Sequence, residues 1–160
     1  MDGKGENTKK VPVAALAVLI RELLEQGQVQ LTVSGASMVP FLVHQRDSVL
    51  VSKPGGKLRR GDIVFYQRSG GAYIMHRIVK IEKNGKLSLC GDAQTCIETS
   101  VAPGQVFGII NTAYRKGKKI DTGSFIWWIF RVPWRYLLPV RHKILRVYNK
   151  IKKQKNGREE

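Results

Sequence analysis

Residues 73–90, YIMHRIVKIEKNGKLSLC, are the part of the chain most informative about its fold. Two runs rich in Val, Ile, Leu and Tyr flank Asn84-Gly85, a pair that favours a tight turn between antiparallel strands. We therefore expect strands at residues 73–82 and 86–90, joined as a hairpin.

Short runs of the same kind continue on both sides of this hairpin, separated by Gly, Asp, Asn and Pro. They predict further strands at residues 29–33, 48–52, 62–67 and 106–114. Gly-Asp pairs at 61–62 and 91–92 are typical of turns, because Asp bonds backbone N–H groups and Gly takes unusual dihedral angles. The pattern indicates a mainly β domain at residues 28–122, built as a small coiled or barrel-like antiparallel sheet.

The N-terminal segment predicts a helix. Residues 1–10 are polar, and we expect them to be disordered. From residue 11 to residue 27, apolar side chains recur at three- and four-residue spacing and form one stripe. The simplest interpretation is a helix packed on the domain, and a helix on a membrane surface is the alternative. The apolar run at 11–20 is shorter than the roughly 20 residues that cross a bilayer, so we expect no transmembrane anchor here.

The C-terminal tail, residues 123–160, combines aromatic and cationic side chains. The formal net charge of the chain is +16, and residues 131–158 hold ten Lys or Arg and no Asp or Glu. The run FIWWIF at 125–130 precedes a basic amphipathic helix, a combination typical of proteins that bind at a lipid interface. We expect peripheral association with an anionic membrane through Trp127, Trp128, Trp134, Arg131, Arg135 and Arg141.

Two alternatives for the tail remain. One is a helix docked on the protein's own sheet with a solvated charged face. The other is nucleic-acid binding, which we consider the weaker alternative because three close tryptophans suit a membrane interface better than a phosphate track.

Ser37 is the candidate nucleophile. It lies in SGASMVP, residues 34–40, where a strand rich in β-branched residues stops at Gly35 and a turn limited by Pro40 follows. A serine in such a turn can present a free hydroxyl. Serine is a poor nucleophile at neutral pH, so it needs a base within hydrogen-bond reach.

His76 is the candidate base. Strand alternation places it on one face with Ile74 and Ile78, and a titratable group on an apolar face needs a partner. A core histidine whose polar atoms are satisfied is the competing interpretation, and the strand pattern alone favours it.

Five short motifs in a fixed order favour the catalytic interpretation of His76 over the core interpretation. They are GASMVP at 35–40, RDSVLV at 46–51, GDIVFY at 61–66, MHRI at 75–78 and Gly-Asp at 91–92. Together they resemble the type I signal peptidases, over about residues 29–113. The bacterial branch of that family has a lysine where this chain has His76, so the resemblance is to the serine-histidine branch of archaea and the endoplasmic reticulum.

The resemblance implies a role for several residues. Ser37 would be the nucleophile and His76 the general base, with Glu98 or Asp92 orienting the imidazole. Several relatives carry an oxyanion-binding serine where this chain has Gly35, so the oxyanion would rely on the Ser37 N–H and on Ser34. No metal or cofactor is implied.

The expected function is therefore that of a serine endopeptidase which cleaves an extended signal or leader segment of a peptide or precursor protein, at or near a membrane surface. A histidine base predicts cleavage that fades below about pH 6 to 6.5. A catalytically inactive peptide-binding module at the membrane surface is the alternative.

Overall fold

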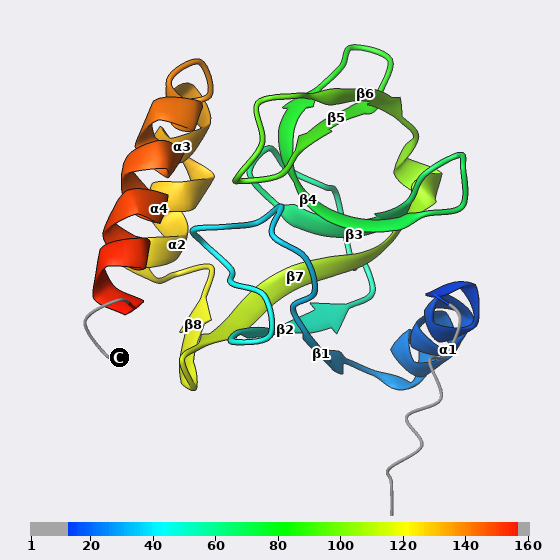
Figure 1. The fold of residues 1–160 in the computed structure, drawn as a ribbon. Helices are drawn as coiled ribbons and strands as arrows, with labels where there is room; N and C mark the ends of the chain where they lie inside the picture. The colour runs from blue at the N-terminus through cyan, green and yellow to red at the C-terminus, as the bar shows by residue number, and fades with distance from the viewer. Residues whose placement is uncertain (1–12, 157–160) are drawn as a thin grey trace, which may run out of the picture.

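The computed structural model of the protein describes residues 13–156 (Figure 1), so the predicted disorder of residues 1–10 lies outside the described residues. The helices are α1 (Val13–Gln26), α2 (Phe125–Arg131), α3 (Pro133–Tyr136) and α4 (Arg141–Asn156), with one 3-10 turn at Pro103–Gln105. The strands are β1 (Val29–Thr32), β2 (Ser48–Ser52), β3 (Ile63–Gln67), β4 (Tyr73–Ile81), β5 (Leu87–Cys90), β6 (Glu98–Val101), β7 (Val106–Arg115) and β8 (Lys118–Asp121).

The strands form one antiparallel sheet in the order β1-β2-β7-β3-β4-β5-β6, and β8 pairs with β7 outside this path. The long strand β7 pairs with both β2 and β3, so it connects the two halves of the sheet. Figure 1 shows that the half containing β3 to β6 curls strongly away from β1 and β2. The mainly β prediction is confirmed, but within residues 13–156 no pairing joins β1 to β6, so the coiled sheet does not close into a barrel.

The hairpin that anchored the prediction is present between β4 and β5. Its loop is closed by a backbone hydrogen bond from Glu82 N–H to the Lys86 carbonyl at 2.8 Å. Gly85 has a φ of 81°, a left-handed conformation that favours glycine. Each of the six predicted strands matches an observed one to within a residue at either end.

The sequence prediction missed β6 and β8. Their sequences, ETSV and KKID, lack the alternation of apolar and polar side chains that marks a half-buried strand. Both strands exist because a neighbour offers unpaired backbone groups, β5 in one case and β7 in the other.

Two hydrophobic clusters hold the sheet and its helices together. One cluster joins α1 and α2 to the first half of the sheet through residues that include Leu24, Val51, Ile110 and Trp127. The other fills the curl of β3, β4 and β5 and includes Val64, Tyr66, Ile78 and Leu89. The sheet coils because each half wraps its own core.

Helix α1 packs on the domain, as the favoured interpretation predicted. Ile20 and Leu24 are buried in the first cluster, whereas Val18, Leu19 and Leu23 stay exposed. Across residues 13–156 we find no helix that is both long enough and apolar enough to cross a bilayer.

The tail folds back onto the domain, and this corrects half of the predicted membrane contacts. Trp127, Trp134 and Arg141 are only 1%, 6% and 2% exposed, so they face the protein interior and are not available to lipid. Trp128 is 50% exposed. Pro133 opens α3 and interrupts the tail, so its first turns follow the surface of the sheet instead of continuing as one straight helix.

Candidate active site

Ser37 lies in a compact turn between β1 and β2. The turn begins at Gly35, whose φ of 89° lies in the left-handed region, and its N–H donates to Nδ1 of His44 at 3.0 Å. A serine at position 35 would be strained in this conformation, so glycine is favoured there. Ser37 itself is half-buried at the end of this turn.

The Gly91-Asp92 corner holds the Ser37 backbone in place. The Ala93 N–H donates to the Ser37 carbonyl at 2.8 Å. A Cβ on Gly91 would lie 2.5 Å from that carbonyl oxygen and 3.1 Å from the Cβ of Ser37, so only glycine permits this approach. Position 91 therefore serves the serine turn as well as its own turn.

Ser37 and His76 line the same pocket, although 38 residues separate them in the sequence. The pocket has a volume of about 240 Å³, and Ser34, Met75 and Gln94 also line it. Ser34 and Gln94 are thus near Ser37, and the role of Ser34 toward an oxyanion stays a prediction. No direct hydrogen bond joins Ser37 to His76 in the part of the chain that the structure describes.

His76 is paired with a residue that the sequence prediction missed. The Tyr66 hydroxyl lies 3.3 Å from Nδ1 of His76 and donates to Oε2 of Glu98 at 2.7 Å. The same carboxylate accepts from Nε of Arg68 at 2.8 Å. Strand register explains the arrangement, because Tyr66 on β3 pairs with Ile74 on β4, two residues before His76 on the same face.

This arrangement fixes the tautomer of the histidine. A hydroxyl has a single hydrogen, so a tyrosine that donates to Glu98 can only accept from the N–H of His76. Nδ1 of His76 therefore carries the proton, and Nε2 keeps a free lone pair. Glu98 contacts Tyr66, and Tyr66 contacts His76, so the direct contact between Glu98 and His76 that the resemblance implied is replaced by one through Tyr66.

Asp92 is not the partner of His76, which corrects the second candidate for that role. Both of its oxygens bind Arg77, at 2.9 Å from Nε to Oδ1 and 2.7 Å from Nη2 to Oδ2. Both side chains are almost fully buried, and Nη1 of Arg77 donates to the Gly61 carbonyl at 3.0 Å. The pair joins the two Gly-Asp corners and has a structural role.

Burial sets the protonation state of His76. The residue is 3% exposed, and desolvation, helped by the positive charge of Arg68, lowers its pKa from 6.5 to about 4 against the opposing charges of Glu98 and Asp92. Burial also disfavours the charged form of Glu98, but hydrogen bonds from Arg68 and Tyr66 outweigh it and lower the pKa of that carboxyl. At neutral pH the site holds a neutral imidazole near a carboxylate.

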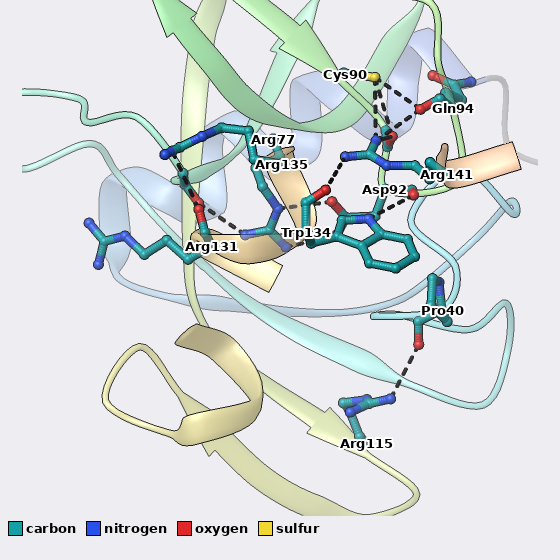
Figure 2. Close-up of polar contacts among 12 residues, drawn as sticks. Pro40, Arg77, Cys90, Asp92, Gln94, Arg115, Arg131, Trp134, Arg135 and Arg141 are labelled. Atoms are coloured by element: carbon teal, nitrogen blue, oxygen red, sulfur yellow. Dashed lines mark hydrogen bonds and ion pairs between the residues drawn. The ribbon is translucent and has the colours of Figure 1, made fainter. Parts of the chain in front are cut away.

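The tail braces the corner that supports Ser37 (Figure 2). Nε1 of Trp134 donates to the Asp92 carbonyl at 3.0 Å. Nη1 of Arg141 donates to the carbonyls of Gly91 and Gln94 at 3.0 and 2.9 Å. Trp134 and Arg141, which we expected to contact the membrane, therefore hydrogen-bond to the loop that supports Ser37.

Metal-ligand groupings are not found in this site. Within residues 13–156, no three His, Cys, Asp or Glu side chains gather as ligands of an ion would. Cys90 and Cys96 are both free thiols.

Comparison with known proteins returned no match to a family model, to a curated protein or to a solved structure. One pocket of this chain brings the serine turn and a neutral histidine together, and this histidine contacts Tyr66, which donates to Glu98.

Proposed function

We propose that the protein is a serine endopeptidase, with Ser37 as nucleophile and His76 as general base. The observation that carries this proposal is the shared pocket, which brings a turn-presented hydroxyl and a buried imidazole to one small surface. The tautomer supports it, because Nε2 of His76 has the free lone pair that a base needs. A pKa of about 4 leaves His76 in the basic form at neutral pH.

In the proposed reaction, Nε2 of His76 takes the proton of Ser37 as its Oγ attacks a peptide carbonyl. The C–N bond then breaks, and the same proton passes to the leaving amine, which gives an acyl-enzyme. Water repeats the sequence on the ester, so its oxygen joins the acyl group and Ser37 regains its hydrogen. The Ser37 hydroxyl must come within hydrogen-bond reach of Nε2 for this step, and free enzymes often hold such groups farther apart than the complex does.

Tyr66 and Glu98 would stabilise the imidazolium that forms during attack. The Nδ1–H of the positively charged ring would donate to the Tyr66 oxygen, and the Tyr66 hydroxyl donates in turn to the Glu98 carboxylate. Glu98 thereby supplies the negative charge without touching the ring. The strongly depressed pKa of His76 means that this stabilisation matters, because the charged ring is costly in a buried site.

The proposed substrate is an extended signal or leader segment of a peptide or precursor protein, a class taken from the resemblance. Peripheral attachment to an anionic membrane surface is proposed as well, with the contacts reduced to the accessible members of the predicted set, Trp128, Arg131 and Arg135. Phe125, 72% exposed and stacked on Trp128 with ring centroids 5.8 Å apart, joins this group.

A probe that reacts with activated serine hydroxyls tests the hydrolase proposal. We expect a fluorophosphonate to label the native chain and Ser69→Ala, but neither Ser37→Ala nor His76→Gln. Ser69 is the matched control, because it is an exposed serine that does not line the pocket. Equal labelling of native protein and Ser37→Ala would falsify the assignment.

A catalytically inactive peptide-binding module is the second candidate. It is favoured by the lack of a direct hydrogen bond between Ser37 and His76 within the described residues. Peptide binding that persists in Ser37→Ala, together with a native chain that neither reacts with the probe nor cuts peptides, would support the module.

A further inference from the structure

A second, larger pocket lies behind the serine turn, where the β7–β8 hairpin meets α2 and α4. It has a volume of about 710 Å³, which is within the range of small-molecule sites. Its cationic side chains are Arg46, Arg115, Lys116, Lys118 and Lys152, and no Asp or Glu lines it. Asp47 lies close by, but its carboxylate already binds Arg46 and the Lys116 backbone N–H. The pocket therefore keeps a large excess of positive charge.

Arg115 shows that this charge is poorly compensated within the protein. Its Nη2 donates to the Pro40 carbonyl at 3.2 Å, as Figure 2 shows, but its buried Nε has no hydrogen-bond partner. Desolvation lowers the pKa of this guanidinium. A buried donor without an acceptor is costly, and an anion bound in the pocket would supply the counter-charge that this guanidinium lacks.

Much of the remaining lining of the pocket is apolar and includes Ile120, Ile126, Phe130 and Ile151. Ile126 belongs to α2, the helix that also carries the exposed Phe125 and Trp128. The apolar lining thus adjoins exposed aromatic side chains on α2. A ligand that matches both kinds of lining residue has an anionic head and an apolar chain.

We propose that this pocket binds the phosphate headgroup of an anionic phospholipid, with an acyl chain lying along Ile126 toward Phe125 and Trp128. The cationic side chains neutralise the phosphate, and the aromatic residues lie at the interface between headgroups and acyl chains, where such rings are favoured. A soluble phosphate would use only the cationic side chains. A nucleic-acid backbone would likewise leave the apolar part of the lining without a matching group.

This inference concerns a site separate from the Ser37 pocket, and it rests on the membrane association proposed above and not on the hydrolase assignment. The two pockets share one segment. Pro40 lines the cationic pocket, is bonded to Arg115 and lies three residues after the nucleophile. A lipid held here would orient the serine turn relative to the membrane from which a substrate segment would emerge.

Vesicle binding by a matched pair of variants tests the proposal. Lys118→Gln/Lys152→Gln removes two exposed cations from the pocket, and Lys83→Gln/Lys86→Gln removes two from the remote β4–β5 hairpin, with the same change in net charge. Each lysine near an anionic surface contributes about fivefold to binding, so the pocket variant should bind phosphatidylglycerol-containing vesicles about twenty-five-fold more weakly than the native chain. The control should change by less than about twofold.

Competition separates the sources of phosphate. Soluble glycerol phosphate, at concentrations matching the lipid, should not displace the protein from vesicles, and a single-stranded oligonucleotide should bind with equal affinity to both variants. The proposal is overturned if glycerol phosphate displaces the protein, if the two variants lose vesicle affinity equally, or if the native chain binds neutral and anionic vesicles alike. Labelling of Ser37 in both variants is measured in parallel, so failure here is distinguishable from failure of the peptidase proposal.

Discussion

Replacing His76 with glutamine should remove a large part of the pH dependence of folding stability. Burial lowers the pKa of His76 from its ordinary value of 6.5 to about 4. Between these values the unfolded chain binds a proton that the folded chain excludes, so stability rises with pH in this window and is lost as the pH falls through it. A tenfold change in a dissociation constant corresponds to about 1.4 kcal/mol, so the full effect is about 3 kcal/mol, of which about 2 kcal/mol is lost between pH 7 and pH 5.

Urea unfolding of the native chain and His76→Gln at pH 7 and pH 5 measures this term. Other groups titrate in both proteins, so the informative quantity is the difference between their two losses. We expect the native chain to lose about 2 kcal/mol more than the variant. Parallel losses in the two proteins would refute the conclusion that a neutral imidazole is buried in the folded state.

The same titration corrects the pH dependence expected from the sequence. The acidic limb of kcat/KM reports the pKa of the base in the free enzyme. We therefore expect activity to persist through pH 6 and to decline near pH 4, instead of fading below about pH 6 to 6.5.

Three substitutions probe the groups around Ser37 and His76, the proposed nucleophile and base. Gly91→Ala places a Cβ 2.5 Å from the serine carbonyl and should abolish probe labelling, whereas Gly55→Ala, with nothing within 4 Å, should not change it. Tyr66→Phe should lower kcat about tenfold with little change in KM, because this residue contacts the histidine and does not line the pocket; a change confined to KM would contradict its positioning role. Arg141→Met should lower the free energy of unfolding by about 2 kcal/mol by removing charged hydrogen bonds to buried carbonyls, and the exposed Arg146→Met should change it by less than about 0.5 kcal/mol. Equal effects of the two arginine variants in urea unfolding would count against the bracing of the corner.

The strands could be predicted because their signals are local. The hairpin at residues 73–90 has its apolar runs and its turn residues next to one another in the chain. The strands β6 and β8 could not, because their own residues are polar and each forms by pairing with a neighbour that the sequence does not identify.

In the candidate site too, some residues could be predicted from local signals and others could not. Ser37 and His76 were identified from a turn signal, a strand face and a family resemblance, all readable within short segments. Tyr66 could have been found only from the register of β3 against β4, which places its hydroxyl next to the histidine. The choice between Glu98 and Asp92 depended on Arg77, which binds Asp92 and leaves Glu98 to Tyr66.

In the C-terminal tail, the order of residues determines which surroundings are favourable, and the tertiary structure determines which surroundings each residue meets. The aromatic and basic residues of the tail, and the amphipathic character of α4, are fixed by the order of residues and predict an affinity for apolar and anionic surroundings. Which surroundings satisfy them is decided by tertiary structure, because the domain offers its own apolar cluster to Trp127 and its own carbonyl groups to Arg141. Burial against a nearby part of the same chain competes with burial in lipid for the same side chains, and only the folded arrangement shows which contact each residue makes.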